Sequence, residues 1–472
     1  MSTAMSPLGR PIACTIVALL IGGCGGGSTS QSSGAGAAPT GTPTPTVVLY
    51  PCPGPALPPV PVGNFDLGNP PGPGIFDLTK LTGSTVGFTA ETVLSRMNYS
   101  YGFAVADYDC DARPDISFFD SYTTRVIDRS PPGVIGYMRW GAPSLEPIVA
   151  NDAFPELQRG GYILFERQVA IDVNGDKLPD IVGVVNSHGA VAAYINPGIR
   201  GVKWTRRYLS FATPGALNIA AADIDGDGDK DIVVAMRNQP DTDPNPAVRG
   251  LVWLQNPGTA DDHWVQRAIG PSDDLTTLRS LVVADMNADG KLDVVTTNNE
   301  TGDLAIFLGD GGLTWRRISA PVLAIHGHYG IAVDLNKDGR SEILQPVYQG
   351  IKLFWLDAAT DTISSQTIAD FASEAEQIVV TEVDAADIDL DGKMDVVFTI
   401  GSLSTSPTDP RRGGVYWLKQ TDQGWEANLI EAGTASYVAV RAVDIDGDGD
   451  ADIVADSEYN LHAVTIWINH TR

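Results

Sequence analysis

One acidic loop recurs seven times between residues 107 and 452, and it constrains the fold more than any other feature of the chain. Each copy carries Asp, Asn or Glu at loop positions 1, 3, 5 and 9, and five copies carry glycine at position 6. Short β-branched runs such as 281–284 and 294–296 flank the loops, which favours strands over helices. The residues at the four positions are, loop by loop, Asp107, Asp109, Asp111 and Asp115; Asp172, Asn174, Asp176 and Asp180; Asp223, Asp225, Asp227 and Asp231; Asp285, Asn287, Asp289 and Asp293; Asp334, Asn336, Asp338 and Glu342; Asp387, Asp389, Asp391 and Asp395; and Asp444, Asp446, Asp448 and Asp452.

The spacing of the loops predicts the architecture. Successive loops begin 65, 51, 62, 49, 53 and 57 residues apart, a period that suits four-stranded propeller blades. We therefore predict an all-β, seven-bladed β-propeller over residues 75–472, with one loop in each blade. The seventh unit stops at Arg472 after its third strand, so we expect the run 88–94 to supply the fourth strand and close the ring.

The third strand of each unit carries an aromatic residue at a matching place. We expect these side chains to pack between neighbouring blades, because large rings dominate the burial of apolar surface. They are Tyr137, Tyr194, Trp253, Phe307, Trp355, Trp417 and Trp467.

The loop chemistry indicates calcium, up to seven ions in all. Calcium takes six to eight hard oxygen ligands, and glycine at position 6 permits the left-handed turn that brings such oxygens together. Ala112 and Lys177 replace that glycine in blades 1 and 2, where we expect weaker binding. An EF-hand would need a glutamate at position 12 and flanking helices, and neither is present. A single copy could be a metal-free Asx-rich turn, but seven such clusters of like charge would be costly without cations.

The charge balance excludes one class of partner. Lys and Arg total 31 against 58 Asp and Glu, a formal net charge of −27, so the surface should repel nucleic acid and anionic lipid. Of the 28 loop positions, all but the three asparagines are acidic, which leaves 25 carboxylates. The metal loops therefore account for most of the acidic excess.

The N-terminal region indicates export. Residues 1–23 are typical of a signal peptide, and Ile21-Gly-Gly-Cys24 resembles the lipobox of bacterial lipoproteins, in which Cys24 would be lipidated. The alternative is an ordinary signal peptide with an incidental cysteine. Residues 24–74, rich in Gly, Ser and Pro, are predicted to be a flexible tether. We expect a lipid-anchored protein that faces the periplasm or the cell exterior and touches the membrane only through this anchor.

Cys52 and Cys110 follow the predicted lipidation site. An oxidising compartment would allow them to pair and so attach the tether to the first blade. Two free thiols are the alternative.

The repeats resemble the FG-GAP/VCBS family, which includes the propellers of integrin α-subunits and of many bacterial exported proteins. The resemblance covers residues 85–472. It implies that each calcium loop joins the first and second strands of a blade, on the face opposite the usual ligand-binding side. Candidate ligand residues on that opposite face are Tyr101, Arg167, Arg279, His326, His328 and Glu382. The histidine pair could also hold a transition metal or act as an acid and a base.

These features favour a non-catalytic binding, adhesion or scaffolding module for a glycan or a protein. The alternative is a glycan-active enzyme, a polysaccharide lyase or hydrolase, on a calcium-stabilised propeller. The sequence contains no Gly-x-Ser-x-Gly elbow, phosphate-binding loop or His-Glu-x-x-His helix.

Overall fold

A computed structural model of the chain describes residues 60–95, 97, 100–121, 135–141, 145–148, 165–237, 250–258, 263–272, 274–311, 314–321, 328–371, 378–401, 413–432, 435–459 and 463–472. All of these residues belong to one compact unit of the chain, residues 48–472. None of the helices in the described part of the chain is long and apolar enough to cross a membrane.

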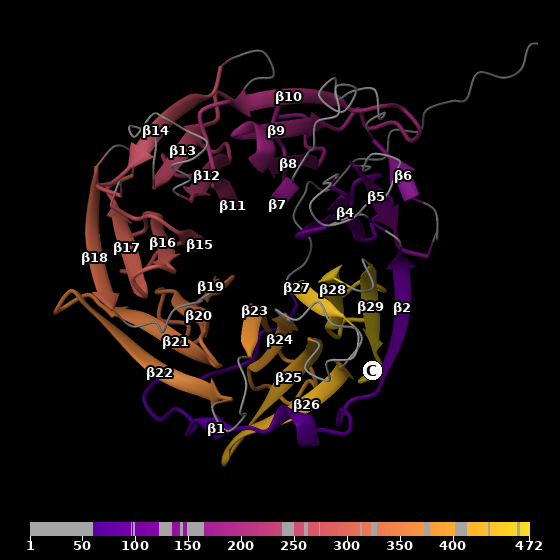
Figure 1. The fold of residues 1–472 in the computed structure, drawn as a ribbon, viewed down its shortest axis with the longest axis vertical. Helices are drawn as coiled ribbons and strands as arrows, with labels where there is room; N and C mark the ends of the chain where they lie inside the picture. The colour runs from indigo at the N-terminus through magenta and orange to yellow at the C-terminus, as the bar shows by residue number, and fades with distance from the viewer. Residues whose placement is uncertain are drawn as a thin grey trace, which may run out of the picture. The chain divides into compact units, whose positions relative to one another are not determined.

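The described strands of this unit form seven sheets, which Figure 1 shows arranged as blades around a central axis. Blade 1 contains β3 (Phe103–Ala106), β4 (Asp115–Phe119), β5 (Ile135–Arg139) and β6 (Leu145–Pro147). Blade 2 contains β7 (Phe165–Ile171), β8 (Asp180–Val185), β9 (Ala190–Ile195) and β10 (Thr205–Ser210). Blade 3 contains β11 (Ala216–Ala222), β12 (Asp231–Met236), β13 (Leu251–Gln255) and β14 (Val265–Ile269).

Blades 4 to 6 repeat this antiparallel order. Blade 4 contains β15 (Leu278–Ala284), β16 (Asp293–Asn298), β17 (Asp303–Gly309) and β18 (Trp315–Pro321). Blade 5 contains β19 (Ile331–Val333), β20 (Glu342–Val347), β21 (Gly350–Asp357) and β22 (Thr362–Asp370). Blade 6 contains β23 (Val379–Ala386), β24 (Asp395–Gly401), β25 (Gly414–Thr421) and β26 (Gly424–Ala432). In the described part of the chain, two short 3₁₀ helices, η1 (Leu78–Lys80) and η4 (Asn186–His188), lie between strands.

Blade 7 joins the two ends of the sequence. Its first three strands are β27 (Ser436–Val443), β28 (Asp452–Tyr459) and β29 (Val464–Asn469). The fourth is β2 (Phe88–Leu94), which pairs antiparallel with β29 from Phe88 opposite Asn469 to Leu94 opposite Val464. The pairing covers what would be an exposed sheet edge, and the strand is the one expected there from the sequence.

The core is divided among the contacts between blades. One buried apolar cluster lies between each pair of neighbouring blades, including blades 7 and 1. Six of the seven predicted aromatics are buried there; Tyr194 and Phe307 are fully buried. The prediction for blade 5 was wrong by one residue. Phe354 is buried whereas Trp355 is partly exposed, because neighbouring residues of a strand point to opposite faces.

The predicted tether boundary at residue 74 requires a correction. Residues 60–74 lie against the propeller: Phe65 is 3% exposed and stacks on Trp425, with ring centroids 6.2 Å apart. β1 (Gly74–Ile75) pairs in parallel with the edge of β22. This segment contributes apolar side chains that are buried against blades 5 and 6. The burial of these side chains orders the segment, although its proline content predicted a flexible tether.

Candidate metal centres and the axial cluster

The seven acidic loops have one backbone conformation, and each joins the first strand of its blade to the second. Position 6 has positive φ in every loop, including Ala112 (67°) and Lys177 (70°). Position 4 also has positive φ in every loop, a feature that the sequence does not indicate. The residues at position 4 are Cys110, Gly175, Gly226, Ala288, Lys337, Leu390 and Gly447. Since only three of them are glycine, composition gives little sign of the turn.

The same hydrogen bonds hold all seven loops. The position 6 amide donates to the position 1 carboxylate, at 2.7 to 3.0 Å. The position 7 amide donates to the position 5 carboxylate, and the position 2 amide donates to the position 9 carboxylate. The loop therefore orders three of its four acidic side chains with its own main chain.

The position 9 carboxylates are the most buried members of the loops. Each is at most 2% exposed, and five also accept an amide from the end of the third strand, as Asp231 does from Asn256 at 2.8 Å. Burial raises the pKa of all seven, to about 6 for Asp293, about 7 for Asp231, Glu342 and Asp452, and about 8 for Asp115, Asp180 and Asp395. Desolvation of the carboxylate is the largest cause of each of these shifts.

Four loops bring carboxylate oxygens close enough to share an ion. In loops 1, 3, 6 and 7, ligand atoms from positions 1, 3 and 9 lie within 4.8 Å of one another. The other three loops have Asn at position 3, where the amide donates to the position 5 carboxylate, as Asn174 does to Asp176 at 2.9 Å. Their amide oxygens are also hard ligands.

The donor chemistry fits a hard cation. All four positions offer oxygen, and one buried carboxylate oxygen at position 3, the Oδ1 atom, has no hydrogen-bond partner in loops 1, 3 and 6 among the described residues. Such an atom carries the full cost of desolvation unless something compensates it. The residues to hold the ion would be those at positions 1, 3, 5 and 9.

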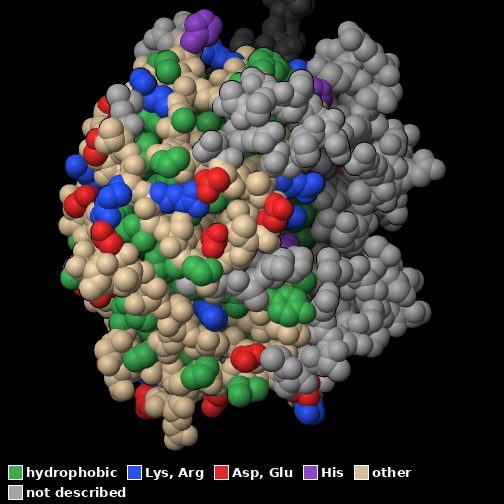
Figure 2. All heavy atoms as spheres, turned by 60° about the vertical axis from the view of Figure 1, so that its left-hand side comes forward, with side chains coloured by type: hydrophobic (Ala, Val, Ile, Leu, Met, Phe, Trp, Pro, Cys, Tyr) green, Lys and Arg blue, Asp and Glu red, His purple; other side chains and the backbone are tan. Residues whose placement is uncertain are grey.

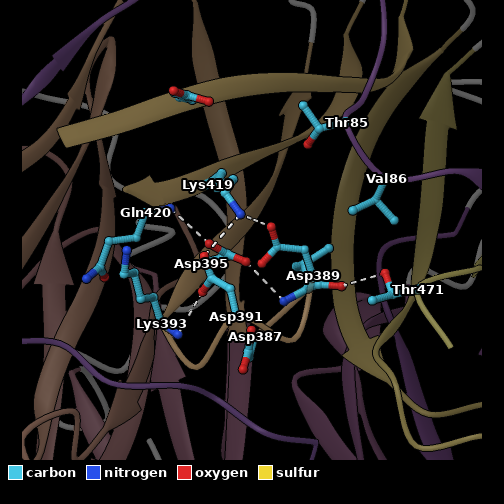
Figure 3. Close-up of polar contacts among 12 residues, drawn as sticks. Thr85, Val86, Asp387, Asp389, Asp391, Lys393, Asp395, Lys419, Gln420 and Thr471 are labelled. Carbon is cyan, nitrogen blue, oxygen red and sulfur yellow. Dashed lines mark hydrogen bonds and ion pairs between the residues drawn. The ribbon is translucent and has the colours of Figure 1, made fainter. Parts of the chain in front are cut away.

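Three loops receive a side chain from the third strand of their blade. In loop 1, Arg139 contacts Asp109 and lies 2.8 Å from Asp111. In loop 3, Gln255 Nε2 donates to Asp225 Oδ2 at 2.5 Å. In loop 6, Lys419 reaches from β25 to contact Asp389 and lies 3.0 Å from Asp391 (Figure 3). Two of the seven loops therefore already contain a protein cation.

The outer rim carries a different charge pattern from the loops. On the face drawn in Figure 2, Lys and Arg are interspersed with Asp and Glu among the described residues, without a large patch of one sign. Arg316 pairs with Asp361 at 2.5 Å and Arg317 pairs with Asp274 at 2.6 Å, all on outer strands or turns. A continuous basic surface of the kind that binds nucleic acid is not formed by the described residues of this face.

Four of the predicted ligand residues belong to one interaction network, which we call the axial cluster. It consists of Tyr101, Arg167, Arg279, Tyr329, Glu382 and Arg441. Glu382 accepts from Arg167 at 2.9 Å, from Arg441 at 2.7 Å and from the Val440 amide at 3.1 Å. The Arg167 guanidinium lies 3.5 Å from the centre of the Tyr329 ring. Arg279 donates to the Tyr101 hydroxyl at 3.0 Å.

Burial limits what this network can bind. Arg167 is 4% exposed, Glu382 3% and Tyr101 8%, so their polar atoms mainly contact each other. Arg279 and His328 are partly exposed. Arg167 comes from the start of β7 and Tyr329 from the residues before β19, at the ends of the first strands away from the acidic loops. A cavity of about 520 Å³ is lined by first strands, including parts of β3, β7, β23 and β27, with Val60 and Val62 on its wall.

Several predictions concern residues beyond the described part of the chain. They are the signal peptide 1–23, Cys24, Cys52, the segment 24–59 and His326. Cys110 is disulfide-bonded, and its partner also lies outside the described residues. Its pairing with Cys52 therefore stays a prediction.

The comparisons with known proteins agree with the repeat pattern. The FG-GAP-like repeat family matches residues 172–234, 285–345 and 387–455, and each match runs from one acidic loop past the next. Loops 2 to 7 are thereby covered, and loop 1 lies outside. No curated protein sequence matches the chain.

Solved structures resemble the chain only distantly. A selenomethionine-substituted virginiamycin B lyase from Staphylococcus aureus is 11% identical, with a TM-score of 0.48, over 81% of this chain and 98% of its own. The Dos1 propeller is 9% identical, with a TM-score of 0.47, over 83% of this chain and 95% of its own. The repeat matches and the seven described sheets show that the chain carries FG-GAP-like repeats and folds as a seven-bladed β-propeller.

Proposed function

We propose that the protein is a calcium-stabilised binding module, exported and displayed on a lipid anchor. A propeller of FG-GAP repeats fits a binding or scaffolding module. The observation that supports calcium most strongly is the common loop conformation: seven loops with positive φ at positions 4 and 6 orient their acidic side chains in the same way.

Calcium suits these loops better than other common cations. The loops offer carboxylate, amide and main-chain oxygens, without cysteine or histidine at the four ligand positions, which disfavours zinc and copper. Magnesium requires near-ideal octahedral geometry and keeps several waters, whereas calcium accepts six to eight flexible oxygen ligands. A nine-residue loop with four acidic or amide side chains matches the second requirement.

Bound calcium would stabilise the connection between the first two strands of each blade. Extracellular calcium sites bind with dissociation constants of about 10⁻⁴ to 10⁻³ M. Calcium at ten times that value would add about 1.4 kcal/mol of stability for each occupied site. Over several loops this would be comparable with the whole net stability of a typical domain.

The test is calcium content together with thermal unfolding, before and after chelation, with magnesium as the matched cation. We expect five to seven calcium ions per chain by elemental analysis, and a melting temperature that falls with chelator and recovers with calcium but not with magnesium. A protein that carries no calcium and melts at the same temperature with chelator would show that the loops are only turns.

We further propose that a glycan or a protein binds the face opposite the acidic loops. The partly exposed Arg279 and His328 at the border of the axial cluster are the described residues best placed to contact it. Glycan arrays and cross-linking on whole cells would test this proposal, with Arg279→Ala expected to weaken binding and Lys393→Met, in loop 6, expected to leave it unchanged. Equal loss of binding in both variants would contradict the assignment of the face.

A further inference from the structure

We propose that loops 1 and 6 are closed by the protein's own cations, and that the propeller therefore binds five calcium ions, in loops 2, 3, 4, 5 and 7. The inference rests on the proposed calcium binding and deepens it, because it states which loops take the ion and which residues decide.

Loop 6 contains a lysine where an ion would be expected. The Lys419 ammonium contacts Asp389 and lies 3.0 Å from Asp391, so it bridges the carboxylates at positions 3 and 5 (Figure 3). The Lys419 side chain is 22% exposed and that of Asp389 16% exposed, so water screens this contact only partly. A divalent ion would have to displace the ammonium or lie beside it.

Loop 1 has the same arrangement with arginine. Arg139 contacts Asp109 and Asp111, and Arg200 donates to Asp109 at 2.5 Å. The Asp109 side chain is 4% exposed, so two guanidinium groups meet a buried carboxylate. Ala112 at position 6 adds a strained turn that glycine would relieve. Loop 1 is also the loop that the FG-GAP-like match leaves out.

The other loops lack such a cation among the described residues. One position on the third strand decides the difference. The first residue after the loop, position 10, pairs with a residue of the third strand, and the next residue on that strand occupies the deciding position. It is Arg139 in loop 1 and Lys419 in loop 6, but Ile195, Gln255, Leu308, Trp355 and Ile468 in loops 2, 3, 4, 5 and 7. Gln255 is neutral. In loop 7, Arg472 donates to the main-chain carbonyl of Asp448 at 3.2 Å rather than to a carboxylate.

Loop 6 also holds residues 61–64 of the N-terminal segment. The Asn64 amide donates to the Gly392 carbonyl at 3.1 Å, the Met394 amide donates to the Asn64 carbonyl at 3.1 Å, and the Asp387 amide donates to the Pro61 carbonyl at 2.7 Å. Cys110, at position 4 of loop 1, is disulfide-bonded. A loop closed by Lys or Arg keeps its shape at any calcium concentration, so these attachments would not depend on calcium.

The experiment counts calcium in the full-length chain after equilibrium dialysis against about 10 mM calcium, ten times the weakest affinity of extracellular sites. We expect five ions in the wild type and six in Lys419→Met. The double variant Arg139→Met, Arg200→Met should also bind six. Lys393→Met is the matched control: it removes the same charge from the same loop, but its ammonium contacts Asp422, so the count should stay at five.

A second pair of variants keeps the inference testable if Lys419→Met fails to fold. Asp225→Ala in loop 3 should lower the count to four, whereas Asp389→Ala in loop 6 should leave it at five. Seven ions in the wild type, or no gain in Lys419→Met, would overturn the inference and leave the proposed calcium binding standing. No bound calcium in any variant would overturn both.

Discussion

The two ends of the propeller axis both gather charged side chains, but they combine the charges in different ways. At one end, seven loops with the same hydrogen bonds gather 25 carboxylates at positions 1, 3, 5 and 9, and only loops 1 and 6 receive a cation from the described residues of the chain. At the other end, the axial cluster combines Arg167, Arg279 and Arg441 with Glu382 and two tyrosines. The first end is repeated and gathers side chains of mainly one charge, whereas the second is built once and brings charges of both signs into contact.

A face built from repeats and a cluster built once differ in the charges that they bring together. A repeat places the same residue at the same point in every blade, so the charges at that face share one sign. The axial cluster needs both signs close together, so its residues must differ from blade to blade. Buried charges are tolerated there because each has a partner of opposite sign or a ring face.

The largest expected effect comes from breaking the axial cluster. Glu382→Ala leaves Arg167 buried without its carboxylate, which should cost about 3–5 kcal/mol of unfolding free energy. The loss should be the same with calcium and with chelator, because Glu382 lies five residues, roughly 16 Å, before the acidic loop along β23, and distant sites add. Chemical denaturation in both conditions measures it.

An exposed ion pair provides the control for that variant. Asp361→Ala removes the partner of Arg316, and both side chains are about half exposed, so the change should stay below about 1 kcal/mol. If Glu382→Ala cost no more than Asp361→Ala, or if it removed bound calcium, the two ends would not be independent and the comparison would fail.

The next effect concerns pH and the position 9 carboxylates. In the calcium-free fold their pKa values are raised to about 6 to 8, so the native state keeps protons that the unfolded state loses near pH 4. Unfolding then releases protons, so the unfolding free energy should fall as the pH rises from about 4 to 8.

Denaturation in chelator between pH 5 and pH 8 measures this dependence. With saturating calcium the fall should shrink or reverse, because the ion binds the deprotonated carboxylates. A calcium-free protein whose stability rises over this range would show that these carboxylates are charged in the native state.

The smallest expected effect concerns position 6 of the acidic loops, where loop 2 differs from the loops that carry glycine. Lys177 has φ of 70° at position 6 of loop 2, where five other loops have glycine. Lys177→Gly should stabilise the protein by about 1 kcal/mol and strengthen calcium binding, since glycine adopts this conformation without strain. Lys177→Ala is the control, because it removes the same charge and keeps the Cβ atom. An equal gain in both variants would assign the effect to charge rather than to backbone strain.

The fold and the acidic loops could be predicted because their information is local and repeated. Strand–loop–strand patterns recur seven times, and the same residues stand at the ends of the strands. The left-handed turn at position 4 was missed because Cys110, Ala288, Lys337 and Leu390 adopt it without glycine. Trp355 was placed in the core by its size, but a shift of one residue along β21 buries Phe354 instead.

The sequence alone determined which oxygen atoms each loop presents, since nine consecutive residues with fixed spacing decide it. The tertiary structure decided which side chains join those loops and which meet on the axis. Lys419 lies 24 residues after Asp395, the last acidic residue of loop 6, and the axial cluster draws on residues from Tyr101 to Arg441. Such contacts depend on strand register and on ring closure, which bring together residues that no local pattern connects.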